Sequence, residues 1–349
     1  MYSDRFMKKI VVIGGGFAGS MIAKSLEDYF DVTLIDSKDY FEFTPSILRT
    51  IIEPEHIRKI QVLHKNYLKK SKIVLGSVSE ITKKDVKTDN EEIDYDYLVV
   101  CSGSSYNLPI KEQNVVYTAR ADHLRDYHDK LERADKVVII GGGLVGVELA
   151  GEICTFYPDK KITLIHAGKR LMERNIKRAG DYAEKFLRSH KVELLLNELV
   201  TKVNKEIITN KGNKRNADIV FACTGIKPNS GFMNNSFSSK LNEKEHIKVN
   251  SHLQIEGLGN IFSAGDVNSI MEEKTAQNAL EQAKIVVNNI KALENNIPLK
   301  EYESRNGPLS ISLGKWDGIL IWKNMVFRGL IPGLMKSLIE KWKIRDWKK

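Results

Sequence analysis

Two glycine-rich segments of the same form occur in this chain, and each follows a short run of apolar residues. The first is Gly14-Gly15-Gly16-Phe17-Ala18-Gly19, and the second is Gly141-Gly142-Gly143-Leu144-Val145-Gly146. Apolar runs before such glycines are typical of buried parallel strands, and the glycines let the backbone turn sharply and approach a pyrophosphate. The helix that follows offers its N-terminal amides to the same anion. Because one dinucleotide needs only one such segment, two copies indicate two dinucleotides held face to face.

Each glycine-rich segment belongs to a predicted strand-helix-strand unit. The first unit has strands at 10–13 and 32–36 around a helix at about 17–29, and the second has strands at 137–140 and 162–166 around a helix at about 144–156. Further buried strands that end in small residues are expected at 96–103, 219–225 and 260–266. Strands and helices that alternate in this way predict an α/β fold with two Rossmann-like domains.

The last part of the chain has a different pattern. A helix is expected at 275–293, and two strands at 309–313 and 319–322 flank Lys315-Trp316-Asp317-Gly318 as a hairpin. A final amphipathic helix is expected from 331 to about 343. Its predicted apolar face is Leu334, Met335, Leu338, Ile339 and Trp342, with Lys336, Glu340, Lys341 and Lys343 on the other face.

Residue usage excludes several kinds of chemistry. Cys101, Cys154 and Cys223 are far apart, which leaves neither a disulfide framework nor a Cys-x-x-Cys redox pair. The eight histidines have no metal-ligand spacing, so we expect no metal site. No apolar run approaches the roughly 20 residues of a membrane-spanning helix, and the N-terminal segment lacks a signal-peptide pattern. We therefore expect a cytoplasmic protein.

Acidic residues at two strand ends point to ribose or ribityl hydroxyls. Asp36 ends the second strand of the first unit, where a carboxylate can accept both ribose hydroxyls of an adenosine. Asp266 follows Gly265 at another strand end, where it is either a ligand of flavin ribityl hydroxyls or an ordinary turn or capping residue.

Together these residues resemble the two-dinucleotide-binding-domain flavoproteins of the pyridine nucleotide-disulfide oxidoreductase superfamily, over nearly the whole chain. The resemblance implies non-covalent FAD in the first unit and NADH or NADPH in the second, with Gly265-Asp266 returning to the FAD domain. The implied organisation is an FAD-binding domain at 1–112 and 236–303, an NAD(P)H-binding domain at 113–235, and a C-terminal hairpin with a basic amphipathic segment at 304–349. Cys101-Ser102-Gly103 departs mildly from the usual Ala-Thr-Gly, whereas Cys223-Thr224-Gly225 keeps the usual Thr-Gly.

Within the superfamily, the missing cysteine pair separates this chain from the disulfide reductases and from sulfide:quinone oxidoreductases. The segment from Asp39 to Arg49, the Lys315-Trp316-Asp317-Gly318 turn and the basic end with Trp347-Lys348 resemble the apoptosis-inducing-factor-like quinone reductases, which include ferroptosis suppressor protein. Type II NADH:quinone oxidoreductases are also similar.

The resemblance carries over to particular residues. The expected cofactor-binding residues are Gly14, Gly16, Phe17, Ala18, Gly19, Asp36, Ser37, Lys38, Arg49, Val78, Ser102, Gly103, Gly265 and Asp266 in the FAD domain, and Gly141, Gly143, Leu144, Val145, Gly146, His166 and Gly225 in the NAD(P)H domain. The expected catalytic residues are Glu148, Gln277 and Lys348, with Lys348 covering the flavin pocket if the C-terminal segment folds back. The helix that begins near Ala276 is expected to place its N-terminus against the flavin, although Glu281 replaces the second glutamine of the type II pattern.

The second unit ends in His166 where an acid is usual, and Lys169 and Arg170 follow it. A carboxylate there selects NADH through the ribose, whereas basic groups tolerate a 2′-phosphate. Use of both nucleotides, or a preference for NADPH, is one interpretation. The other is that Lys169 and Arg170 only begin a solvated helix.

Most of the excess positive charge lies after residue 322, where eight basic residues face two acidic ones in a chain of net charge +9. Three interpretations of this segment stay open. Its apolar face packs on the FAD domain, it lies on a membrane surface with Trp342 and Trp347 at the headgroups, or it binds a partner or nucleic acid. Nucleic acid is the least expected, and a homodimer stays open.

The resulting hypothesis is an FAD-dependent NAD(P)H:quinone oxidoreductase with peripheral membrane contact. Two alternatives belong to other classes. One is a redox-sensing signalling flavoprotein, and the other is a reductase of a small acidic electron-carrier protein that the positive charge attracts.

Overall fold

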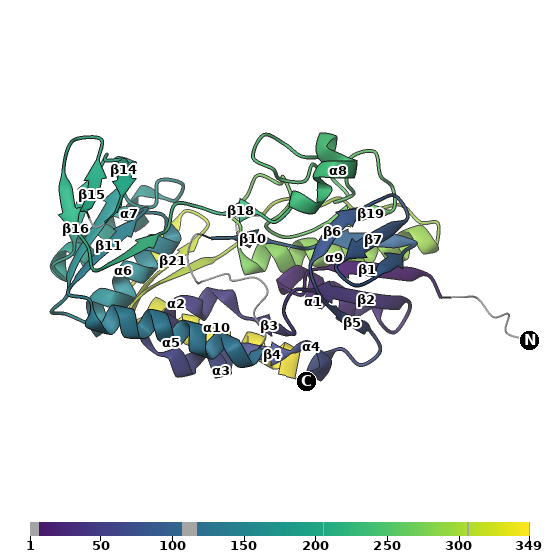
Figure 1. Ribbon diagram of the computed structural model, residues 1–349, viewed down its shortest axis with the longest axis horizontal. Helices are drawn as coiled ribbons and strands as arrows, with labels where there is room; N and C mark the ends of the chain where they lie inside the picture. The colour runs from purple at the N-terminus through teal and green to yellow at the C-terminus, as the bar shows by residue number, and fades with distance from the viewer. Residues whose placement is uncertain (1–6, 107–116, 205, 306, 349) are drawn as a thin grey trace, which may run out of the picture.

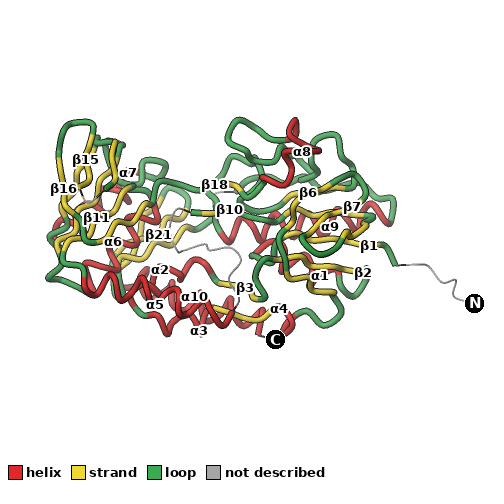
Figure 2. Tube along the Cα trace, in the orientation of Figure 1, coloured by secondary structure: helices red, strands yellow, loops and turns green. Residues whose placement is uncertain are grey.

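The computed structural model describes residues 7–106, 117–204, 206–305 and 307–348. Two α/β lobes lie side by side, and helices α5 (Tyr117–Arg133) and α10 (Leu330–Lys348) run along the lower edge of the molecule in the view of Figure 1. In Figure 2 the strands gather in two groups, one in each lobe, with helices around them. The predicted α/β fold with two Rossmann-like domains is confirmed.

A five-stranded parallel sheet in the order β19-β9-β1-β2-β5 forms the first lobe. Its strands are β1 (Lys9–Ile13), β2 (Asp31–Asp36), β5 (Lys72–Leu75), β9 (Tyr97–Val100) and β19 (Ile261–Ser263). Strand β19 comes from the late part of the chain and pairs with β9, Ile261 opposite Leu98. The segment that ends at Gly265 and Asp266 therefore returns to the first lobe, as predicted.

Alternate residues of β1 are buried on opposite faces of this sheet, as expected of a strand covered on both sides. Ile10 and Val12 belong to the core that includes α1 (Phe17–Leu26) and α9 (Ala276–Glu294). Val11 and Ile13 belong to a second core on the other face. That face is covered by a small antiparallel sheet of β6 (Val78–Ile81), β7 (Asp85–Thr88) and β8 (Glu92–Asp94).

The second lobe, at the left of Figure 1, repeats this plan with four parallel strands in the order β13-β12-β11-β17. They are β11 (Lys136–Ile140), β12 (Lys161–His166), β13 (Glu193–Leu196) and β17 (Ile219–Ala222). Helices α6 (Leu144–Phe156) and α7 (Lys177–Ser189) pack on one face, and β14 (Val200–Val203), β15 (Glu206–Thr209) and β16 (Lys214–Asn216) form an antiparallel sheet whose Ile207 packs on the other.

Shorter elements connect these parts. They are β3 (Tyr40–Glu42), α2 (Ile47–Ile52), α3 (Ile57–Ile60), β4 (Gln61–Leu63), α4 (His64–Tyr67), β10 (Ser104–Ser105), β18 (Lys227–Pro228) and α8 (Asn234–Phe237), with 3-10 turns at Thr44–Ser46, Pro54–His56, Gly231–Met233 and Ser238–Lys240.

Helix α5, which the sequence assigns to the second domain, packs against the first segment of the chain. Its Arg120 is buried and forms an ion pair with Glu42 of β3, and Nδ1 of its His128 lies 3.1 Å from the carbonyl oxygen of Ile51. The predicted domain boundary at residue 112 lies outside the described residues. The boundaries at residues 235 and 303 stay predictions.

The C-terminal segment differs from its prediction in two ways. The expected hairpin of β20 (Leu309–Leu313) and β21 (Asp317–Trp322) is extended by a third antiparallel strand, β22 (Met325–Arg328). Helix α10 also continues to Lys348, five residues beyond its predicted end.

Helix α10 packs by the face opposite to the predicted apolar one. Leu338 and Trp342 of the predicted apolar face are 64% and 61% exposed, whereas Lys336 and Glu340 are turned inward. The inward residues Lys336, Glu340, Ile344 and Trp347 share one helix face by their spacing. Two ion pairs account for the difference, because Nζ of Lys336 lies 2.7 Å from Glu148 and Nε2 of His56 lies 3.0 Å from Glu340. Charges with partners can be buried, and hydrophobic periodicity does not detect such partners.

Trp347 attaches the end of α10 to the first lobe. Its ring stacks on Phe41 with 4.1 Å between centroids, stands edge-on to Phe17, and donates its indole N–H to Oγ of Ser20 at 3.0 Å. The C-terminal end of the chain is thereby packed against the first turn of α1.

We therefore expect Trp347→Ala to lower the free energy of unfolding by about 3–5 kcal/mol, because it removes a buried ring and leaves a cavity. Trp342→Ala on the same helix is the matched control, and it should change the free energy by no more than about 0.5 kcal/mol since the ring is exposed. Urea denaturation followed by far-ultraviolet circular dichroism measures both. Equal losses in the two variants would contradict this packing.

Candidate functional site

The first glycine-rich segment forms a turn that only glycine can make. Gly14 has φ +94°, and a β-carbon there would lie 2.4 Å from the carbonyl oxygen of Cys101. A β-carbon on Gly19 would lie 1.8 Å from the carbonyl oxygen of Gly14. Helix α1 therefore begins directly behind β1, which is the close packing that a phosphate-binding turn requires.

The second glycine-rich segment has the same geometry. Gly141 has φ +111°, and a β-carbon there would lie 2.3 Å from the carbonyl oxygen of Cys223. A β-carbon on Gly146 would lie 1.9 Å from the carbonyl oxygen of Gly141. The two lobes thus present the same turn, as the repeated sequence predicts.

Both turns leave room for an anion. A β-carbon on Gly16 or on Gly143 would meet no atom within 4 Å, and neither residue caps its helix with a side chain. The first amides of α1 and α6 have no partner within their helices, and they carry the positive end of the helix dipole. The expected residues Phe17, Ala18, Leu144 and Val145 supply these amides. This arrangement fits a dinucleotide pyrophosphate in each lobe.

Asp36 lies beside the first turn, as predicted for a residue that binds the ribose. Its Oδ2 accepts a hydrogen bond from the amide of Gly15 at 2.8 Å and lies 3.1 Å from Nε2 of His64, and its Oδ1 accepts one from the amide of Lys38. Burial would raise the pKa of Asp36, but hydrogen bonding to His64 and the charge of Lys38 hold it below its ordinary value. Asp36 is therefore an ionised acceptor at the end of β2.

Two buried residues behind Asp36 were not predicted from the sequence. His64 is fully buried, and its Nδ1 lies 2.6 Å from the hydroxyl of Tyr67. Burial raises the pKa of Tyr67, so its hydroxyl stays protonated. Nothing in the local sequence links His64 to Asp36, because 28 residues separate them.

Three other residues expected to bind FAD lie near Asp36. Ser37 and Lys38 follow it directly, and Val78 lies two residues beyond Gly76, whose amide donates to the carbonyl oxygen of Asp36.

The two lobes are joined where their strand ends meet. Ser104 pairs with Pro228 in a short antiparallel bridge of β10 and β18, and Oγ of Ser102 donates to the carbonyl oxygen of Asn229 at 2.6 Å. Gly103 and Gly225 both have positive φ with open space beside them. Both glycines are among the expected cofactor-binding residues, and the structure has them at this crossing between the lobes.

The late strand end reaches the same region. Oδ2 of Asp266 accepts a hydrogen bond from Oγ of Ser104 at 2.8 Å, and the amide of Gly265 donates to Oε1 of Gln282 at 2.7 Å. The phenol of Tyr106 is close enough to acidic residues of both lobes to be influenced by them. Burial raises its pKa, and the negative charges of Asp266, Glu148 and Glu273 raise it further.

Glu148 and Arg49, predicted as site residues, take part in a polar cluster between the lobes and the C-terminal segment. Oε1 of Glu148 accepts hydrogen bonds from the amide of Ser312 at 2.9 Å and from Nζ of Lys336 at 2.7 Å. Arg49 forms an ion pair with the buried Glu152 at 2.9 Å. We call Arg49, Glu148, Glu152, Ser312 and Lys336 the junction cluster.

The other two expected catalytic residues lie apart from Glu148 in sequence and in contacts. Gln277 is exposed at the start of α9, and its side-chain amide lies beside Gly307. Gln282, five residues later, is buried, and its Oε1 accepts hydrogen bonds from the amide of Gly265 and from the side chain of Asn268. The α9 N-terminus is capped by Thr275, whose Oγ1 accepts from the amide of Asn278. Lys348 is exposed and lines a shallow groove with Gln61, Val62, Leu63 and Asn66. The roles of Gln277 and Lys348 stay predictions.

Near the strand end of the second lobe, the guanidinium of Arg170 is engaged in hydrogen bonds within the protein and is therefore not free to bind a 2′-phosphate. Its guanidinium donates to the carbonyl oxygens of the turn that follows, namely those of Leu171, Met172, Glu173 and Asn175. Burial lowers the pKa of His166, so its imidazole is neutral near pH 7.

The three cysteines are free and buried, and burial raises the pKa of each thiol to about 12. Cys101 and Cys223 occupy equivalent places, each with its β-carbon against the last glycine of one turn. They pack beneath the dinucleotide turns and have no thiolate character that would serve redox chemistry.

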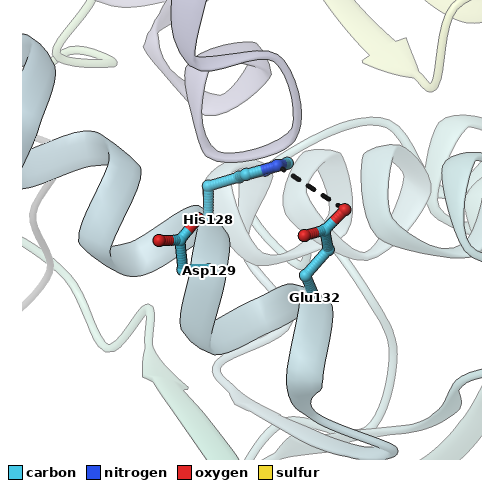
Figure 3. A group of neighbouring side chains, drawn as sticks. All are labelled: His128, Asp129 and Glu132. Carbon is cyan, nitrogen blue, oxygen red and sulfur yellow. Dashed lines mark ion pairs between the residues drawn. The ribbon is translucent and has the colours of Figure 1, made fainter.

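Among the described residues, one group could offer three metal-ligand atoms, namely His128, Asp129 and Glu132 of α5. Figure 3 shows His128 turned toward Glu132, one helical turn away, with their nearest atoms 4.0 Å apart. Both carboxylates are exposed, which is an ordinary arrangement on a solvated helix face.

Among the described residues, every helix is either too short or too polar to span a membrane.

Comparison with known proteins agrees with this geometry. Residues 8–283 match the family model described as pyridine nucleotide-disulphide oxidoreductase. The chain is 32% identical to apoptosis-inducing factor homolog A of Dictyostelium discoideum, over 95% of this chain and 89% of that protein. It is also 32% identical to ferroptosis suppressor protein 1 of Taeniopygia guttata, over 89% and 87%. The sulfide:quinone oxidoreductase structure from Aquifex aeolicus has the same fold, with a TM-score of 0.83, 20% identity, and coverage of 98% of this chain and 91% of that one.

The two turns can be tested separately, because Gly16 and Gly143 have backbone conformations that alanine also adopts. Gly16→Ala should weaken FAD binding by about tenfold or more, since its methyl group displaces a phosphate from the helix amides. Gly143→Ala should do the same to NADH binding and leave the FAD content unchanged, so each variant is the control for the other. Flavin absorbance per protein and calorimetric titration with NADH measure the two effects. Loss of both cofactors in either variant would contradict independent sites.

Proposed function

The chain belongs to the pyridine nucleotide-disulphide oxidoreductase family as an FAD-dependent NAD(P)H oxidoreductase, and we propose that its electron acceptor is a quinone. The proposed electron transfer between two dinucleotides rests on one observation, the pair of dinucleotide turns in two lobes that meet at β10 and β18. When bound, FAD supplies the chemistry that accepts a hydride from NAD(P)H and returns two electrons to an acceptor.

The side chains contribute binding and orientation. In the first lobe, Asp36 offers an ionised carboxylate to the adenosine ribose, and His64 and Tyr67 hold it in place. In the second lobe, the amides of α6 receive the pyrophosphate of NAD(P)H. In this proposal Asp266, whose Oδ2 accepts a hydrogen bond from Ser104, is the acceptor for the ribityl hydroxyls. We assign the catalytic power mainly to this positioning.

Glu148 acts in this proposal as a positioning residue. It is close enough to Tyr106 to influence the phenol, and it also receives hydrogen bonds from Ser312 and Lys336. The junction cluster thereby ties the nucleotide-binding lobe to β20 and α10. Arg49, expected to bind FAD, balances the charge of Glu152 in the same cluster.

A small-molecule acceptor is favoured because the described cysteines are buried and unreactive, so no thiol pair relays electrons. The exposed apolar side chains of the C-terminal segment also suit an acceptor that is itself apolar. The Aquifex aeolicus protein of the same fold is a sulfide:quinone oxidoreductase.

We propose that the C-terminal segment contacts a membrane from the cytoplasmic side. Its exposed apolar side chains form what we call the apolar surface, consisting of Trp316, Trp322, Met325, Phe327, Leu330, Ile331, Leu334, Leu338, Ile339 and Trp342. Lysine and arginine side chains alternate with them along α10, and Trp342 is flanked by Lys341 and Lys343. Exposed apolar groups between cations are typical of helices that lie on anionic lipid. Long-chain quinones dissolve in the lipid bilayer.

The acceptor can be identified by measuring NADH oxidation by the FAD-loaded protein with a short-chain quinone, with oxygen alone, and with a small acidic ferredoxin. We expect the quinone to support the fastest turnover, and Gly143→Ala to raise the KM for NADH without changing that order. Activity with ferredoxin alone, falling steeply as salt is added, would assign the protein to the carrier reductases instead.

Membrane contact is tested by replacing two residues of the apolar surface. Leu338→Ser with Trp342→Ser should lower the affinity for vesicles of phosphatidylcholine and phosphatidylserine by about tenfold or more, since each exposed apolar group adds transfer free energy. The matched control is Leu199→Ser with Met271→Ser, which removes two exposed apolar side chains elsewhere. Sedimentation with vesicles measures binding. Unchanged sedimentation would contradict membrane contact through this surface, and a shift only in the dimer fraction on gel filtration would show that another copy of the chain covers it.

A further inference from the structure

The two lobes differ at the residue that ends their second strand. Asp36 ends β2 in the first lobe, whereas His166 ends β12 in the second. The imidazole of His166 packs on the second turn, with Cγ 2.8 Å from the position that a β-carbon on Gly142 would take. Burial lowers its pKa, so it offers a ribose neither a negative nor a positive charge near pH 7. The charge at this site therefore has to come from elsewhere.

The segment after β12 folds back over the glycine-rich turn. The amide of Met172 donates to the carbonyl oxygen of Gly142 at 2.8 Å, and Leu171 packs on Gly142. Met172 has φ +52°, a left-handed conformation that is uncommon for this residue type. This sharp reversal carries Glu173 back toward the strand end, seven residues after His166.

The carboxylate of Glu173 lies beside the loop that directly follows the end of β12. Its Oε1 accepts a hydrogen bond from the amide of Lys169 at 2.8 Å, and its Cδ is 2.5 Å from the position that a β-carbon on Gly168 would take. The carboxylate is also close enough to His166 to influence the imidazole. Only glycine at position 168 leaves room for this contact. A carboxylate is thus present beside the second turn, although the strand end itself has none.

The neighbouring cations are less available than the sequence implies. Arg170 is committed to four carbonyl oxygens of the turn, and it fixes the turn in the form that presents Glu173. The amide of Lys169 is already occupied by Glu173, while the Lys169 side chain is exposed. Lys169 is therefore the rival determinant, since its ammonium group could attract a phosphate.

We propose that Glu173 replaces the missing strand-end acid and makes the second lobe selective for NADH over NADPH. A carboxylate accepts hydrogen bonds from the ribose hydroxyls of NADH. The 2′-phosphate of NADPH carries about −1.5 to −2 charges and is repelled by a carboxylate at this position. The inference rests on the use of NAD(P)H in the proposed function, but it is independent of the electron acceptor.

Binding of ADP-ribose and of 2′-phospho-ADP-ribose tests the proposal, because these ligands lack the nicotinamide and cannot reduce the flavin. The experiment compares the FAD-loaded wild type with Glu173→Gln, which keeps an acceptor for the Lys169 amide but removes the charge. Glu184→Gln on α7 is the matched control, since it removes a partly exposed carboxylate whose ion pair, among the described residues, is with Arg188. Lys169→Gln tests the rival, and isothermal titration calorimetry gives every Kd.

We expect the wild type and Glu184→Gln to bind ADP-ribose about tenfold more tightly than its 2′-phosphate, and Glu173→Gln to lose most of that difference. Lys169→Gln should not create or remove the preference. The proposal is overturned if the wild type binds the 2′-phosphate equally or more tightly, if Glu173→Gln keeps the wild-type ratio, or if neither ligand binds. A failure of quinone reduction alongside the expected binding ratios would refute only the proposed acceptor.

Discussion

In both lobes the first helix starts so close behind the central strand that only glycine can occupy the contact. The β-carbon of any other residue at Gly19 or Gly146 would lie 1.8 or 1.9 Å from a carbonyl oxygen. This close approach aims the helix amides at the mouth of the turn, where Gly16 and Gly143 leave open space. Because the turn occurs twice, the chain presents two anion sites, and the remaining elements determine how those sites face each other.

Polar contacts, together with apolar packing, set the position of the C-terminal segment. Glu148 is bound by Lys336 and Ser312, and Glu340 by His56. Removing one partner of such a pair would leave a largely buried charge without compensation, so these contacts specify one orientation of α10. That orientation turns Leu338 and Trp342 outward. The same pairs therefore hold the segment on the two lobes and create its exposed apolar surface.

The local sequence was sufficient to predict the elements whose apolar residues recur in a regular pattern. The apolar runs and glycines predicted β1, β11, α1 and α6, and the family resemblance implied the return of the segment that ends at Asp266 to the first lobe, as the structure has it. The inward face of α10 and the third strand of the C-terminal sheet were missed. Periodicity assigns a lysine to solvent, whereas Lys336 is held inward by a glutamate 188 residues earlier in the chain.

Site residues were predictable where they belong to a motif and unpredictable where they act through distant contacts. Asp36 follows from its strand end, but His64 behind it is brought there by the fold. Arg170 has a suggestive position in the sequence, yet its guanidinium serves the backbone of a turn. The same turn presents Glu173, whose importance depends on a left-handed residue and on Gly168.

The central claim is that the two turns hold two dinucleotides close enough for a hydride to pass between them. Anaerobic titration of the FAD-loaded protein with NADH, followed by the visible absorbance of the flavin, tests it most directly. The account predicts that each equivalent of NADH bleaches an equivalent of flavin, and that Gly143→Ala shifts the titration to higher NADH concentrations. NADH that binds in calorimetry but leaves the flavin spectrum unchanged would contradict it.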